Sequence, residues 1–94
     1  MYTRNVADVC RYKTLLTEEL RDSFLIEHLF LPGDINLMLT DVDRAVVGAA
    51  VPARKPLGLP VPDELRCEFF CQRREVGILN LGARGSVVVD DESY

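Results

Sequence analysis

The sequence from Cys67 to Tyr94 reads CEFFCQRREVGILNLGARGSVVVDDESY, and its alternating pattern predicts two antiparallel strands of a β-domain. Apolar residues alternate along residues 76–81, and a turn at Gly82–Gly85 separates them from the apolar run at residues 86–89. A further turn follows at Asp90–Glu92, and residues 93–94 resemble the start of a third strand. A strand without a neighbour leaves its backbone N–H and C=O groups open. We therefore expect the chain to be part of something larger.

Length and composition restrict the class of protein. Ninety-four residues suffice for one small domain, which at this size often needs an oligomer or further chain for stability. A hydrophobic content of 48% with 28% charged residues argues against disorder. The net charge of −4 argues against nucleic acid as a partner. No stretch matches a signal peptide or a membrane span, and three cysteines are an odd number, so we expect a cytoplasmic protein without a disulfide framework.

One short helix is predicted near the N-terminus. Residues 1–16 show no clear period and predict an extended arm or an edge segment. Thr17 predicts the helix start, because its hydroxyl can cap free N–H groups and two carboxylates follow it near the positive end of the helix dipole. A full capping box is not expected, since Leu20 stands where Glu or Gln would be needed. The expected helix runs from Glu18 to Phe24.

The remaining pattern predicts short strands separated by turns. We expect strands at residues 25–31, 35–40, 44–51 and 65–72. The second and third of these form a hairpin, whereas the four prolines of residues 52–62 predict a loop. Strands at this spacing with one short helix indicate a mainly β fold, an antiparallel sandwich or barrel.

Few residues have the spacing of a metal site. His28 is the one histidine, and on a strand at 25–31 it would be a packed or partly exposed structural residue. Cys67 and Cys71 would share a strand face but lie roughly 13 Å apart, too far to hold one ion. We expect both cysteines to be buried, small apolar residues.

Three further motifs have structural and functional interpretations. Gly82–Gly85 lies between two expected strands, so it predicts a hairpin turn and not a phosphate-binding loop. Asp41 and Asp43 flank another hairpin and are expected to be solvated. The cluster Arg73-Arg74-Glu75 interrupts an apolar stretch. It could bind a carboxylate, or it could form an ion pair within the chain or between subunits.

Three segments together resemble a known enzyme family. They are TEELRDSFLIE at Thr17–Glu27, DRAVVG at Asp43–Gly48, and RREVGILNLG at Arg73–Gly82. The chain resembles, from about residue 12 onward, the N-terminal part of 5-keto-4-deoxyuronate isomerase, also named 4-deoxy-L-threo-5-hexosulose-uronate ketol-isomerase. The segment RREVGILNLG is the most specific part of this resemblance.

The resemblance implies a fold and a reaction. Members of this family are cytoplasmic enzymes of pectin and uronate breakdown, with two cupin-like barrels per chain and homohexameric assembly. They convert 4-deoxy-L-threo-5-hexosulose uronate to 3-deoxy-D-glycero-2,5-hexodiulosonate, with a zinc ion acting as a Lewis acid. Three histidines and a glutamate of the C-terminal barrel hold the zinc. Residues 1–94 would then be an incomplete N-terminal cupin-like domain, without the C-terminal metal-binding barrel.

The implied role of this chain is scaffolding. No catalytic, cofactor-binding or metal-binding residue is assigned to it, and zinc is expected only in the full-length family member. We expect no isomerase activity from these residues alone, and a partner that is either a homo-oligomer or the missing C-terminal barrel, which a separate chain could supply. The alternative is a non-catalytic β-domain for binding or assembly. Whether Arg44, Arg73, Arg74 or Glu75 contacts substrate stays open.

Overall fold

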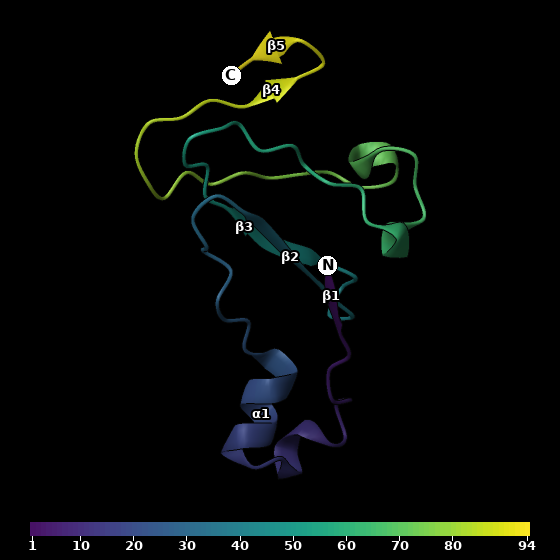
Figure 1. Cartoon of the computed structure of the whole chain (residues 1–94). Coiled ribbons are helices and arrows are strands. Elements are labelled where there is room, and N and C mark those ends of the chain that lie inside the picture. The colour runs from purple at the N-terminus through teal and green to yellow at the C-terminus, as the bar shows by residue number, and fades with distance from the viewer.

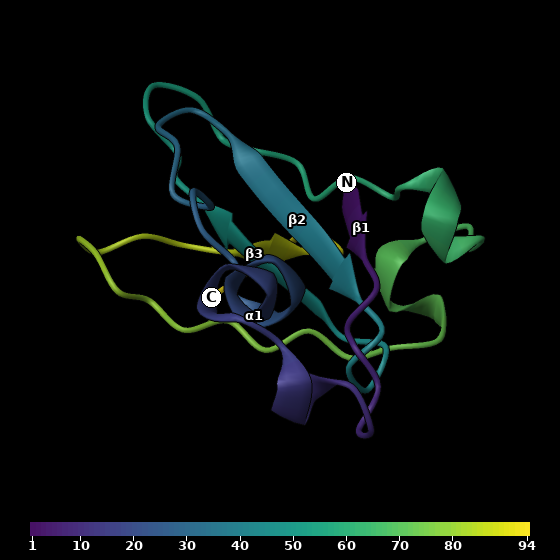
Figure 2. The ribbon, with the colours of Figure 1, turned by 90° about the horizontal axis from the view of Figure 1, so that it is seen from below.

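The computed structural model describes residues 1–94 and consists of two small sheets, one α-helix and three short 3-10 helices. The elements are β1 (Tyr2–Arg4), η1 (Tyr12–Thr14), α1 (Thr17–Phe24), β2 (Ile35–Thr40), β3 (Val46–Ala50), η2 (Asp63–Leu65), η3 (Phe70–Gln72), β4 (Val88–Val89) and β5 (Glu92–Ser93). The sheet β1–β2–β3 lies in the middle, with α1 at one end of the molecule and the β4–β5 hairpin at the other (Figure 1). In Figure 2 the molecule is viewed nearly along the axis of α1, and the strands of the sheet run across this axis.

The central sheet combines the predicted hairpin with an edge strand. β2 and β3 pair antiparallel, with Ile35 opposite Ala50 and Leu39 opposite Val46, so this hairpin prediction is confirmed. β1 pairs with β2 in parallel, which confirms an edge segment at the N-terminus but makes the sheet mixed and not wholly antiparallel. The two strands approach closely at Gly48, where a Cβ atom would lie 2.5 Å from the Leu37 side chain.

Side chains connect the start of the chain to the sheet and the helix. Asp41 accepts a hydrogen bond from the Val6 backbone N–H at 2.8 Å, which holds the chain after β1 beside the β2–β3 turn. The Arg4 guanidinium donates to the carbonyl of Leu25, directly after α1. Asp41 is exposed, as expected of a turn aspartate, but its carboxylate also serves as a structural acceptor.

The predicted helix is confirmed with a different start. Leu16 occupies the N-cap position and Thr17 is the first helical residue, so the prediction of Thr17 as the cap is wrong by one position. Glu19 is therefore the third helical residue, and its carboxylate accepts a 2.8 Å hydrogen bond from the Leu16 backbone N–H. Only this half of a capping box can exist, because a leucine side chain has no acceptor.

Two predicted strands are absent. Residues 25–31 form an irregular connection, in which His28 has a left-handed backbone with φ of 60°. Residues 65–72 contain η3 and a left-handed Arg66, with φ of 48°, in place of a strand. The first segment is almost continuously apolar and the second has apolar residues at strand period, but neither has a neighbouring strand in these residues to supply ladder hydrogen bonds.

The predicted pairing near the C-terminus is also wrong. Residues 76–81 do not pair with residues 86–89; instead β4 pairs antiparallel with β5, Val89 opposite Glu92. The turn between them is the one predicted at Asp90, and Asp90 and Asp91 both have positive φ, 48° and 68°, as a type I′ hairpin turn requires.

The chain buries very little of itself. Ala49, Phe70 and Thr40 are the buried residues, and the radius of gyration is 15.6 Å, against about 12 Å for a compact domain of this length. The accessible surface is 8134 Å², whereas a folded monomer of this mass exposes about 5,500 Å². Five of the nine regular elements are strands, which agrees with the predicted β class, but they form open sheets and no closed barrel. No helix has the length and apolar character to cross a membrane.

Candidate functional site

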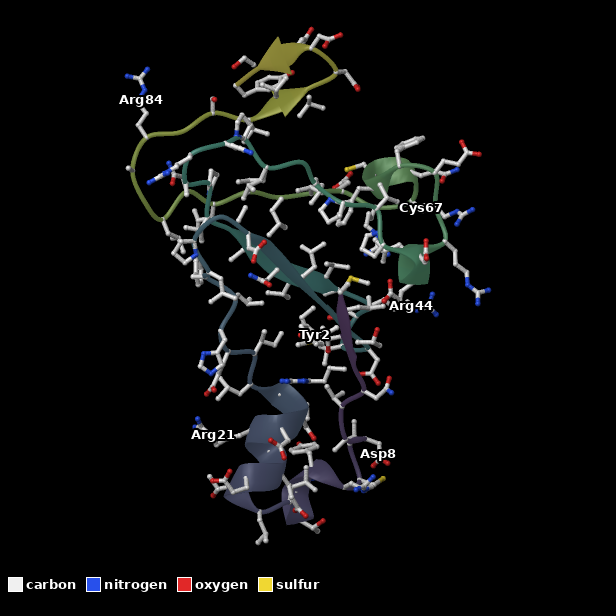
Figure 3. The ribbon with its side chains drawn as sticks, in the orientation of Figure 1. Tyr2, Asp8, Arg21, Arg44, Cys67 and Arg84 are labelled. Carbon is white, nitrogen blue, oxygen red and sulfur yellow. The ribbon has the colours of Figure 1, made fainter.

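One hollow in the surface lies between η2 and η3. It has a volume of about 380 Å³, and we call it the arginine hollow. It is lined by Val61, Pro62, Asp63, Arg66, Cys67, Glu68, Gln72 and Arg73. Cys67 marks the place of this segment at the side of the molecule in Figure 3.

Hydrogen bonds between side chain and backbone shape this loop. Arg73 donates through Nη1 to the carbonyl of Arg66 at 2.9 Å, and Gln72 accepts through Oε1 from the N–H of Glu68 at 2.8 Å. Phe70 is buried beneath the loop, and the Arg74 guanidinium lies 5.9 Å from the centre of its ring. Phe70 thus anchors the segment, and a cation–π contact covers it.

The arginine hollow has balanced charge but unpaired arginines. Asp63 and Glu68 line it together with Arg66 and Arg73, yet no carboxylate lies within 4 Å of either guanidinium. No ion pair within the chain involves Arg73, Arg74 or Glu75, so the intrachain form of that interpretation is wrong; pairing between subunits stays a prediction. Guanidinium groups match carboxylates in shape and charge, so carboxylate binding by Arg73 also stays a prediction.

The residues considered for metal chemistry lie apart. No three His, Cys, Asp or Glu side chains converge closely enough to hold an ion. His28 is 87% exposed in its side chain, so it is not packed, and its Nε2 lies 3.5 Å from a Glu27 carboxylate oxygen. Cys67 is half-buried and Cys71 is exposed, so the predicted burial is wrong for both; residues 65–72 form no strand, and Cys71 lies in η3.

The other singled-out residues belong to turns. Asp43 and Arg44 adopt left-handed backbones in the exposed β2–β3 turn, and Arg44 does not line the arginine hollow (Figure 3). Asn80 folds the Gly82–Gly85 segment back, accepting from Gly82 N–H at 3.0 Å and donating to the Ala83 carbonyl at 3.1 Å. The chain bends at residues 82–83, but paired strands do not flank the bend, so the predicted hairpin turn is wrong.

A second hollow lies between the sheet and α1. Its volume is about 260 Å³, and Arg4, Val6, Ser23, Phe24, Ile26, Thr40 and Val42 line it. Arg4, which is bonded to Leu25, is its one charged residue, so this hollow is an apolar packing seam. Sequence reasoning singled out Arg73 but missed Arg66 and Gln72, because no sequence pattern signalled the 3-10 turns that bring the three residues together.

Three curated proteins that are similar to this chain share one name. The chain is 45% identical over 93 residues to the 4-deoxy-L-threo-5-hexosulose-uronate ketol-isomerase of Halalkalibacterium halodurans, covering 99% of the chain and 33% of the relative. It is 42% identical over 94 residues to the enzyme of that name from Lachnoclostridium phytofermentans, covering 100% and 34%. The enzyme of Formosa agariphila is 49% identical over 78 residues, covering 83% and 28%.

The matches cover nearly all of this chain but only part of each relative. The chain spans about a third of the length of the curated relatives it matches. No family model matches the sequence. No solved structure matches it either. The identity over nearly all its residues makes the chain a homologue of the 4-deoxy-L-threo-5-hexosulose-uronate ketol-isomerase family, matching the members as an N-terminal portion of about a third of their length.

Proposed function

We propose that this chain is the N-terminal part of a uronate ketol-isomerase that converts 4-deoxy-L-threo-5-hexosulose uronate to 3-deoxy-D-glycero-2,5-hexodiulosonate in pectin and uronate breakdown. The observation that supports the proposal best is the 45% identity over 99% of the chain to a relative of that name. The role of these residues is scaffolding within an N-terminal cupin-like barrel of a cytoplasmic homo-oligomer, a hexamer in the family. The chain has no isomerase activity by itself.

A zinc site of the kind that the family implies does not fit the residues present. Such a site needs several imidazole or carboxylate groups around one point, whereas the one histidine here is exposed and no three metal-binding side chains converge. In this proposal the zinc ligands are the three histidines and the glutamate of the C-terminal barrel that the family resemblance implies. No step of the reaction is assigned to a residue of this chain.

The alternative function is a non-catalytic β-domain that serves binding or assembly. The exposed apolar surface favours it, since Leu79, Leu81 and Ile78 are all at least two-thirds exposed. Surfaces of this kind mark interaction sites in soluble proteins. Both functions predict a partner, but only the first predicts that the partner completes an isomerase.

An isomerase assay separates the two functions. The 94-residue chain is assayed alone, and then mixed with a polypeptide carrying the two thirds of the Halalkalibacterium halodurans enzyme that the match does not cover. We expect no turnover and no stoichiometric zinc for the chain alone, and turnover in the mixture. Turnover by the chain alone would contradict the scaffolding role. Tight association without turnover would favour the binding module.

A further inference from the structure

We propose that residues 76–81 form a β-strand whose neighbours come from polypeptide corresponding to the two thirds of the ketol-isomerases that this chain does not span. We call residues 76–81 the open strand. This inference rests on the proposed function and deepens it, because it names the surface of the chain that meets the rest of the enzyme and the mode of contact.

The backbone of the open strand lacks hydrogen-bond partners. No backbone–backbone hydrogen bond involves any of the residues 73–86. The bonds that Asn80 makes to Gly82 and Ala83 come from its side chain and leave the backbone of the open strand free. Such a row of free N–H and C=O groups is what a neighbouring strand pairs with in β-augmentation.

The side chains of the open strand are apolar on both faces. In an extended chain Ile78 lies on one face and Leu79 and Leu81 on the other, and their exposed fractions are 67%, 80% and 71%. A strand at the surface of a sheet would have polar residues on one face. Two apolar faces are typical of a strand that is covered by other elements on both faces. Pairing at one edge alone would satisfy backbone groups but would leave these side chains exposed to water.

The exposed area of the whole chain leaves room for a large partner. The accessible surface exceeds that of a compact monomer by roughly 2,600 Å², while one side of a standard protein interface buries about 800 Å². A small docking peptide would cover a minor part of this excess. The excess therefore favours a large, folded partner.

The comparisons favour one occupant over a second copy of this chain. A second copy could pair its own open strand with this one, but each copy would still present both apolar faces to water. The relatives that contain this stretch, in contrast, carry about twice as much additional polypeptide. That additional part can supply both neighbouring strands and a covering layer, which is what the open strand lacks.

The test mixes the 94-residue chain with the uncovered two thirds of the Halalkalibacterium halodurans enzyme. Amide hydrogen exchange is followed by mass spectrometry on peptides covering residues 73–86. We expect the amides of the open strand to exchange rapidly in the chain alone and to slow at least about tenfold in the mixture. Unchanged exchange despite association would overturn the proposal. Exchange that is already slow in the chain alone, and that slows further as the concentration of the chain rises, would assign the strand to a second copy instead.

A pair of matched variants keeps the result specific. Leu79→Asp places a charge that would have to be buried, and it should weaken the association at least about tenfold. The control is Leu16→Asp at the start of α1, whose leucine is similarly exposed at 72% but lies at the far end of the molecule from the β4–β5 hairpin (Figure 1). Equal affinities for the two variants would contradict the proposal.

The outcome for this surface is distinguishable from the outcome for the function. Protection of the open strand without isomerase turnover leaves this inference standing and contradicts the proposed function. Turnover without protection of residues 76–81 supports the proposed function and contradicts this inference, because the partner then completes the enzyme through another surface.

Discussion

Gly48 shows how one residue controls the central sheet. A Cβ atom at this position would lie 2.5 Å from Leu37 Cδ2 and 2.6 Å from the Asn36 carbonyl oxygen, and the latter belongs to the backbone and cannot rotate away. Gly48→Ala should therefore destabilise the β2–β3 hairpin by about 1–3 kcal/mol. Amide hydrogen exchange in β2 and β3 measures the change. Gly58→Ala is the control, because a Cβ there meets nothing within 4 Å, and an equal effect of both would contradict this account.

Tyr94 gives the one pH dependence at the residue scale. Its hydroxyl donates a 2.7 Å hydrogen bond to a Glu92 carboxylate oxygen, and this bond raises the pKa of Tyr94 above its ordinary value. A raised pKa in the folded state means that the stabilisation is complete below the unfolded pKa of about 10 and is lost as pH rises through the folded value. The contribution of this hydrogen bond to the β4–β5 hairpin should therefore be lost only in alkali.

Phenolate absorbance, recorded as the difference between the native chain and Tyr94→Phe, follows this titration. Glu92→Gln should move the titration of Tyr94 to lower pH, because a neutral amide no longer disfavours the phenolate. An unchanged midpoint in Glu92→Gln would show that the hydrogen bond does not set the pKa.

At the scale of the element, α1 has a start that can be improved. Leu16 occupies the N-cap and cannot accept a hydrogen bond, while Glu19 already makes the reciprocal half of a capping box. Leu16→Ser should add the missing acceptor and stabilise the helix by about 0.5–1 kcal/mol. Circular dichroism of the chain during heating measures the gain. Leu16→Ala supplies no acceptor and should not stabilise the helix. Equal stabilisation by the two variants would mean that the gain comes from removing the exposed leucine side chain.

The elements that sequence predicted well are local ones. α1 follows from its two adjacent carboxylates and its apolar spacing, and the β2–β3 hairpin from alternation around a tight turn. Residues 25–31, 65–72 and 76–81 are as apolar as the predicted strands require but are not strands, because a strand needs a neighbour and these segments have none. In the arginine hollow, Arg73 could be identified from its charge cluster. Its hydrogen bond to Arg66 depends on the left-handed backbone of Arg66, which a sequence pattern does not predict for a residue other than glycine.

At the scale of the whole molecule, the open architecture predicts the solution behaviour of the chain. With a radius of gyration of 15.6 Å and three buried residues, the chain alone should bind the dye ANS and unfold over a broad range of urea. Dye fluorescence should fall when the remaining two thirds of a relative is added, since the apolar surface is then covered. A sharp urea transition without dye binding would contradict this picture.

The parallel pairing of β1 with β2 has a consequence for the order of folding. Tyr2 lies opposite Met38 and Arg4 opposite Thr40, so the first strand cannot join the sheet until a chain segment of more than thirty residues has closed upon it. The β2–β3 hairpin closes a loop of a few residues and forms first. We therefore expect the amino terminus to stay unpaired during synthesis until residues 35–50 have left the ribosome. Any extension fused ahead of Met1 will lie beside the last edge of the sheet to close.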